Sequence, residues 1–124
     1  MSINKVILLG NAGHDASYRE FEVGGQVAQF SLATTKKAHK TKDGKDIPER
    51  TEWHNVVLVG GLAKVAKDYL KKGDKVYIEG EIRTRKYTNQ QGEEKSIVEI
   101  VGTSMELLSP KPKQQEYEDL PIDY

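Results

Sequence analysis

Cations and aromatic rings, the side chains that bind nucleic acids, gather in one part of the sequence. The cations are Lys36, Lys37, Lys40, Lys42 and Lys45 in a first stretch and Arg83, Arg85 and Lys86 in a second. Trp53, the only tryptophan, lies between the two stretches, and Tyr87 follows the second. A single nucleic-acid strand is held by cations that follow its phosphates and by rings that stack on its bases, each stack contributing on the order of 1–3 kcal/mol. The set predicts a binding surface for single-stranded nucleic acid.

Each part of this set also has an ordinary structural explanation. A lysine-rich run is commonly a solvated loop, and residues 36–50 also carry Asp43, Asp46 and Glu49. Trp53, judged from its own strand alone, is better explained as a packing residue. The presence of both kinds of side chain on one predicted domain is what favours nucleic-acid binding.

Catalytic and metal-binding sequence patterns are missing. His14, His39 and His54 fall on different predicted elements and none belongs to a His-x-x-x-His pair. The sequence also has no Gly-x-Ser-x-Gly nucleophile motif. We expect His54 to be a hydrogen-bonded structural or interface residue, and we expect no enzyme activity, no metal and no cofactor.

The strand that positions Trp53 is predicted at residues 51–60, which are rich in β-branched side chains and end at a glycine pair. Because side chains alternate between the faces of a strand, Trp53 and Asn55 share one face and His54 points to the other. Trp53 therefore lies beside an amide on a half-polar face. Both are candidate nucleic-acid-binding residues.

Further strands are expected at residues 4–10, 18–23, 26–35, 74–88 and 94–108. Residues 36–50 read as a long, mobile hairpin arm with a turn at Asp43-Gly44, and the end of the 74–88 strand reads as a second, basic arm. One amphipathic helix is expected from Leu62, Val65, Ala66, Tyr69 and Leu70, with Gly73 as its stop.

About five strands joined by hairpins, with a single helix between the third and fourth, are typical of the mainly β, five-stranded OB-fold Greek-key barrel. An immunoglobulin-type sandwich would lack the helix, and the chain has no alternating strand–helix rhythm. The first strand is apolar on both faces, with Val6 and Leu8 opposite Ile7 and Leu9. A partner subunit is a simple cover for the second face.

The composition bounds the domain count and the location. The 124 residues predict an OB-fold domain at 1–108 followed by a tail at 109–124. The chain has no cysteine, no membrane-length apolar run and no signal-peptide layout at its start, so we expect a cytoplasmic protein. The 19 basic and 19 acidic residues cancel, and the net charge therefore gives no indication of a partner.

The tail is expected to be disordered, because it has prolines, glutamines and acids and no periodic apolar face. Its end places apolar residues among carboxylates, which is typical of a short linear motif. This candidate partner-binding segment comprises Glu118, Asp119, Leu120, Pro121, Ile122, Asp123 and Tyr124.

Several stretches together closely resemble the bacterial and phage single-stranded DNA-binding protein family. They are residues 4–11, 51–58, 62–73, 76–80 and 83–87, and the resemblance covers about residues 3–108 in order. It implies a homotetramer that wraps single-stranded DNA with little sequence preference in replication, recombination and repair. It also implies a tail that recruits replication and repair proteins. By the same resemblance, Trp53 and Tyr87 are base-stacking aromatics and Arg83, Arg85 and Lys86 lie on a phosphate-binding arm.

The chain departs from that pattern at three places. Many family members carry a further aromatic on the first arm and another near the end of the central strand, where this chain has Ala38 and Val59. Fewer stacking rings predict weaker or more salt-sensitive binding, for which the lysines could compensate. The tail continues past Leu120-Pro121 instead of ending in proline and phenylalanine.

Three other classes of function fit parts of the sequence. An oligomeric recruitment or scaffold protein would use the apolar first strand and the tail. An RNA-binding OB module would use the same contacts, because stacking and phosphate contacts do not sense the 2′-hydroxyl. An OB-fold nuclease would cleave single strands in the presence of a metal.

Overall fold

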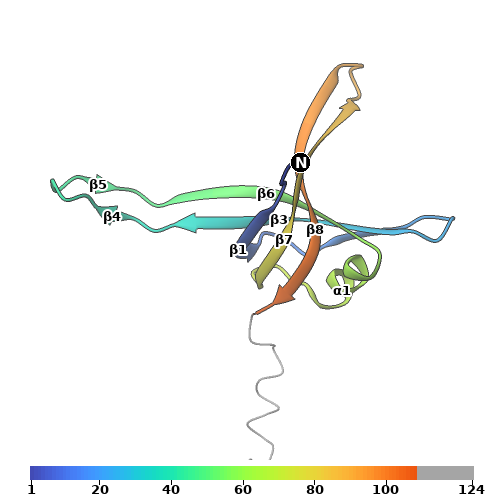
Figure 1. The fold of residues 1–124 in the computed structure, drawn as a ribbon, viewed down its shortest axis with the longest axis horizontal. Coiled ribbons are helices and arrows are strands. Elements are labelled where there is room, and N and C mark those ends of the chain that lie inside the picture. Colours follow the sequence, from blue (N-terminus) through green and yellow to red (C-terminus); the bar gives the residue numbers. More distant parts are fainter. Residues whose placement is uncertain (109–124) are drawn as a thin grey trace, which may run out of the picture.

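Alternating apolar residues and glycine-containing turns divide the chain into strands and one helix (Figure 1). The computed structural model describes residues 1–108. The elements are β1 (Val6–Ala12), β2 (Ser17–Glu20), β3 (Gln26–Lys36), β4 (His39–Lys40), β5 (Asp46–Ile47), β6 (Arg50–Val59), α1 (Gly61–Tyr69), β7 (Lys75–Thr88) and β8 (Glu94–Leu107). The predicted tail, with its segment 118–124, lies outside the described residues.

The five longest strands close into a barrel. Their neighbour order is β1-β7-β8-β6-β3, and β1 pairs with β3 as well, which completes the ring; β2 pairs with β3. The β6–β8 pairing is parallel and the other pairings are antiparallel. The helix falls between β6 and β7, the third and fourth of the long strands. This is the Greek-key OB arrangement, so the predicted fold class is confirmed.

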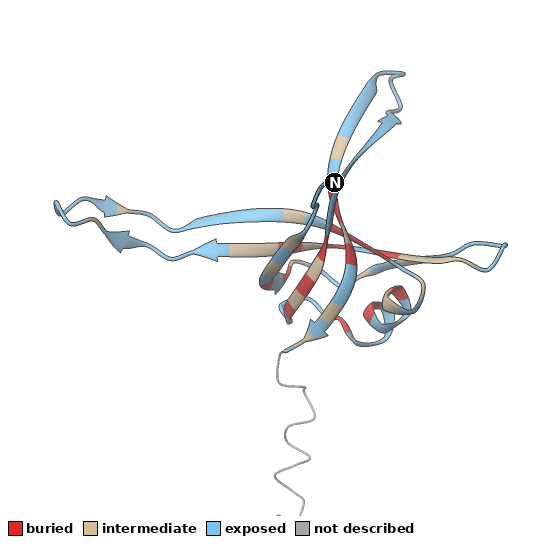
Figure 2. Ribbon diagram, viewed as in Figure 1, coloured by how far each residue is buried: buried red, intermediate tan, exposed pale blue. Residues whose placement is uncertain are grey.

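The core fills the barrel and its α1 end (Figure 2). Its fully buried members include Leu32, Val56, Leu58, Val76 and Ile78 from the three strands β3, β6 and β7, together with Ala63 and Ala66 from the helix. In β6 the valine and leucine run after Asn55 is buried, whereas the part that carries Trp53 is exposed. One end of this strand therefore anchors in the core while the other presents side chains to solvent.

The predicted helix is present, but only part of its predicted face is buried, with Leu62, Ala66 and Leu70 against the core. Ala63, Ala66 and Leu70 are buried, but Val65 and Tyr69 are 40% and 58% exposed. The small alanines let the helix approach the barrel closely, whereas Val65 and Tyr69 lie to one side of the contact. The helix also ends at Tyr69, before the predicted stop at Gly73, which instead has a positive φ of 88° in the following turn.

The second predicted strand is shorter than expected, because β2 ends at Glu20. The N–H of Phe21 donates to the carbonyl of Gly25, and the N–H of Gly24 donates to the carbonyl of Phe21. This turn begins at Phe21, so Phe21 and Val23 are exposed rather than half-buried.

The two predicted hairpin arms extend from the barrel, as does the hairpin between β2 and β3 (Figure 1). The first continues the β3–β6 ribbon through the short β4–β5 pair, and the predicted turn is present with Gly44 at a φ of 86°. The second is the outer part of β7 and β8, which pair as far as Thr88 and Glu94. Both arms are mostly exposed (Figure 2). No helix within residues 1–108 is long and apolar enough to cross a membrane.

Candidate nucleic-acid interface

Trp53 lies on the outer face of β6, opposite Ala33 of β3, and is 60% exposed. It is therefore not a core residue. Its ring lies against the backbone of Gly13, where an added Cβ would be 2.5 Å from the ring atom Cζ3 of Trp53. On the other face of β6, His54 Nε2 forms a 2.8 Å hydrogen bond with Thr34 Oγ1 in a partly buried position, as expected for a structural histidine.

The lysines of the first arm are exposed, and no ion pair within residues 1–108 involves them. Lys36 lies at the end of β3, where it pairs with Arg50 of β6, and Lys40 lies on β4 opposite Asp46. Lys37 and Lys42 lie in the segments before and after β4. These four side chains can meet a polyanion without first breaking a protein contact.

Arg83 and Arg85, in contrast, are bound to a buried carboxylate. Glu99 of β8 is 1% exposed and accepts hydrogen bonds from Arg83 Nη2 at 2.8 Å and Arg85 Nε at 3.1 Å. Burial raises the pKa of the Glu99 carboxyl, but the hydrogen bonds from Arg85 and Arg83 outweigh it, and the net pKa is lowered. The same contacts raise the pKa of Arg85. Both arginines remain about half exposed, at 49% and 45% of their side chains.

Farther along the second arm, Lys86 and Tyr87 are exposed. Lys86 Nζ lies 3.8 Å from Glu94 Oε1, a solvent-exposed pair that stabilises the arm little. Tyr87 is 43% exposed and pairs in register with Lys95. A ring with an open face beside a cation is suited to a nucleotide.

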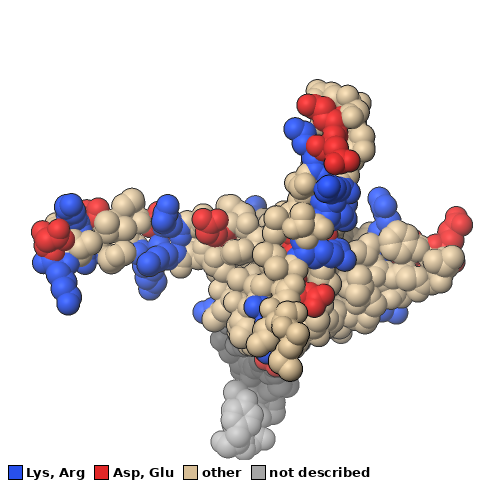
Figure 3. Space-filling model, turned by 45° about the horizontal axis from the view of Figure 1, so that its top comes forward, with Lys and Arg blue, Asp and Glu red and all other residues tan. Residues whose placement is uncertain are grey.

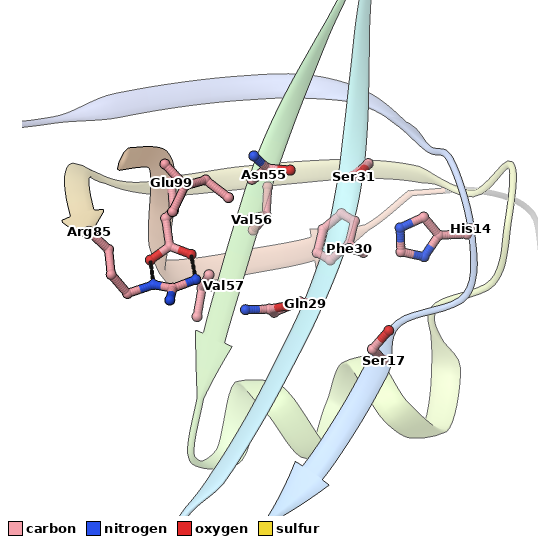
Figure 4. A pocket seen from close by; sticks show the side chains of 11 residues that line it. His14, Ser17, Gln29, Phe30, Ser31, Asn55, Val56, Val57, Arg85 and Glu99 are labelled. Atoms are coloured by element: carbon pink, nitrogen blue, oxygen red, sulfur yellow. Dashed lines mark hydrogen bonds and ion pairs between the residues drawn. The ribbon is translucent and has the colours of Figure 1, made fainter. Parts of the chain in front are cut away.

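A polar recess of about 230 Å³ crosses β3 and β6 beyond Trp53 (Figure 4). Gln29 and Ser31 of β3 and Asn55 of β6 line its middle. The ion pair of Arg85 and Glu99 lies at one end and His14 lies at the other (Figure 4).

The structure thus groups the predicted site residues unevenly. Trp53 and Asn55 share the β6 face, and Asn55 and Arg85 line the same recess. The lysines spread along the first arm, and basic side chains also gather at the base of the second arm (Figure 3). Within the described residues, no three histidine or acidic side chains are placed to hold a metal ion.

Sequence reasoning missed Glu99, Gly13 and the side chains of Gln29, Ser31 and His14. For Glu99 a signal existed, because a hairpin that joins residues 88 and 94 places Glu99 opposite Arg83. For Gly13 and the recess no local signal existed, since these contacts depend on how the β1–β2 segment crosses the barrel.

A comparison with family models matches residues 3–108 to the single-strand binding protein family. A curated single-stranded DNA-binding protein of Bacteroides thetaiotaomicron is 51% identical over 111 residues, which are 90% of this chain and 69% of the relative. Another, of Xanthomonas axonopodis pv. citri, is 48% identical over 106 residues, which are 86% of this chain and 58% of the relative. Part of each relative therefore lies beyond the match.

A solved structure described as a Plasmodium falciparum SSB complex with ssDNA is similar in fold, with a TM-score of 0.73 and 30% sequence identity. The similarity covers 90% of this chain and 97% of that chain.

Proposed function

The chain belongs to the single-strand binding protein family, whose members are non-enzymatic DNA-binding proteins, and from this premise we propose how it acts. It binds and protects single-stranded DNA during replication, recombination and repair. Trp53 and Tyr87 stack on bases, the lysines of the first arm and Arg83, Arg85 and Lys86 contact phosphates, and Asn55 contacts a base beside Trp53.

The observation that carries this proposal is the exposed indole of Trp53 on a barrel with two basic arms. A tryptophan left 60% exposed loses much of the hydrophobic stabilisation that its burial would give. Stacking on a base would recover part of it, on the order of 1–3 kcal/mol. The cations nearby would hold the strand by its phosphates whatever its sequence.

Trp53 is the only tryptophan, so its fluorescence tests the proposal directly. We expect strong quenching when oligo-dT is added, little response to duplex DNA, and reversal as salt is raised. Titration with oligo-U under the same conditions measures any RNA binding. Folded protein whose fluorescence does not respond to any strand would contradict the stacking role, and cleavage of the strand with magnesium or calcium would indicate a nuclease.

The assembly and the tail complete the proposal. Ile7 and Leu9 of β1 are 58% and 50% exposed on one face, and association into a homotetramer would cover them. Residues 118–124 recruit replication and repair proteins in a cytoplasmic, nucleoid-associated setting, because their carboxylates and apolar side chains suit a basic, apolar pocket on a partner. Deleting residues 109–124 should then remove partner binding and leave DNA binding in place, whereas loss of DNA binding would favour a tail-based scaffold role.

A further inference from the structure

The polar recess between the two arms has side chains suited to the edge of a nucleobase. Trp53, Asn55 and Val57 succeed one another on one face of β6, which is exposed at Trp53 and Asn55 and covered at Val57, and their β3 partners are Ala33, Ser31 and Gln29. Successive positions on this face are roughly 7 Å apart, so the recess begins one position from the indole. A strand with one base on Trp53 would carry a neighbouring base to the recess.

The amides in the middle of the recess are available to a ligand. The side chains of Gln29 and Asn55 are exposed, and neither forms a hydrogen bond with another side chain drawn around the recess (Figure 4). Each amide can donate and accept hydrogen bonds, and so can the Ser31 hydroxyl. Turning an amide by half a rotation exchanges its donor and acceptor positions.

The two ends of the recess are fixed by protein contacts. His14 Nδ1 lies 2.6 Å from the backbone carbonyl of Asp15, which can only accept, so Nδ1 carries the proton. In the neutral form of the ring, Nε2 is then the acceptor. At the other end, the ion pair with Glu99 holds the Arg85 guanidinium in place (Figure 4).

We infer that this recess is an adaptable base-edge subsite, in which the amides of Gln29 and Asn55 hydrogen-bond the edge of a base next to the one on Trp53. This inference rests on the proposed binding of single-stranded DNA and goes beyond stacking and phosphate contact. Because the amides can match either donors or acceptors, the subsite accepts all four bases but requires a base that can hydrogen-bond. It therefore makes the binding dependent on base edges without selecting one sequence.

The test compares oligo-dT with an oligomer of the same length built from difluorotoluene nucleotides. Difluorotoluene has nearly the shape of thymine and keeps a ring face and the phosphates, but it lacks the hydrogen-bonding edge. We expect the full-length wild-type chain to bind oligo-dT about fivefold more tightly than the analogue, as one or two neutral hydrogen bonds would give. In Asn55→Leu and Gln29→Leu that ratio should fall towards one, through weaker binding of oligo-dT and unchanged binding of the analogue.

Gln26→Leu is the matched control, since it removes an amide from the same strand outside the recess. It should keep the wild-type ratio. Equal binding of both oligomers by the wild type would overturn the inference while leaving the proposed function intact. So would variants that lose affinity for both oligomers equally. Failure of the wild type to bind oligo-dT at all would remove the proposed function and the inference together.

Discussion

Glu99 changes what two of the predicted phosphate-binding cations can do. A guanidinium has five N–H donors, and the contacts with Glu99 use only part of those of Arg83 and Arg85. Both arginines can therefore bind Glu99 and still offer donors to a phosphate. The cost is charge, because the cluster of three side chains carries a net charge of +1 instead of +2. Glu99 thus weakens the attraction of this cluster for phosphate but holds the two guanidinium groups in fixed positions.

The same cluster makes folding sensitive to acid. Because the pKa of Glu99 is lowered in the folded state from its ordinary 4.5, the unfolded chain binds more protons in acid than the folded chain does. The stabilisation is present above about pH 4.5 and is lost as the pH falls through the folded-state pKa. We expect Glu99→Gln to lower the free energy of unfolding by ~2 kcal/mol at neutral pH, because it leaves two arginines without their counter-charge.

Denaturant unfolding at a series of pH values measures this effect. The loss of stability between about pH 4.5 and pH 3 should be smaller in Glu99→Gln than in the wild type. Glu94→Gln, which removes the exposed partner of Lys86, is the control and should change stability by less than about 0.5 kcal/mol. Identical pH profiles for the wild type and Glu99→Gln would show that the ion pair contributes nothing.

Gly13 positions the indole by having no side chain. We expect Gly13→Ala to push the ring from its place, since the new Cβ would lie 2.5 Å from Cζ3 of Trp53. Because the ring is exposed it can turn aside, so stability should change little while the affinity for oligo-dT falls about fivefold. Gly61→Ala, with nothing within 4 Å of its Cβ, should leave both unchanged. Unaltered binding by Gly13→Ala would mean that the position of the ring does not matter.

At the scale of elements, predictions from alternation agreed with the structure where one face of a strand meets solvent. The pattern of residues 51–60 placed Trp53 and Asn55 together because the period of a strand is fixed by its backbone. The helix was harder, since Val65 and Tyr69 look as apolar as the helix residues that are buried, yet both are exposed. Which face of a helix is buried depends on how closely it must approach the barrel, and the sequence of the helix alone does not contain that distance.

The recess shows the same limit more clearly. Its walls come from elements far apart in the chain, including β3, β6 and β8. The register of β3 on β6, which places Ser31 beside Asn55, is set across the long arm between them. The predicted turn at Asp43-Gly44 marks the centre of this hairpin, but the signal does not decide between a two-residue and a three-residue loop, and a register shift of one residue would reverse every face.

The first arm should act through charge, and its effect should appear in the salt dependence of binding. For single strands the plot of log affinity against log salt concentration has a negative slope, which is steeper by about 0.7 for each phosphate that the protein neutralises. We expect Lys36→Gln combined with Lys37→Gln to make the slope shallower by up to about 1.4, because both lysines are exposed and without an ion pair in the described part of the chain.

Lys64→Gln is the control for that experiment, since Lys64 is an exposed lysine on α1 rather than on an arm. It should leave the slope unchanged. If the double variant and Lys64→Gln changed the slope equally, the arm would attract DNA only through net charge and would make no phosphate contacts of its own.

At the scale of the whole molecule, the barrel is closed and its core is filled, yet one strand still exposes apolar side chains. Ile7 and Leu9 alternate with Val6 and Leu8, which pack against the core, so β1 is apolar on both faces. A closed barrel has no further internal surface to bury the outer face. The remaining way to cover it is contact with another molecule, and a second copy of the chain brings the same face.

We therefore expect Ile7→Glu to dissociate the proposed homotetramer. The side chain is 58% exposed in the single chain, so a glutamate there is solvated in the monomer and is forced into an apolar contact only in the oligomer. Sedimentation equilibrium should show a multiple of the 13.9 kDa chain mass for the wild type and a shift towards 13.9 kDa for the variant. Val23→Glu is the control, because Val23 is exposed in the turn between β2 and β3 and does not belong to β1. This variant should keep the wild-type mass. A monomeric wild type would remove the homotetramer, and with it any wrapping of one DNA strand around several subunits, while the site on each barrel would remain.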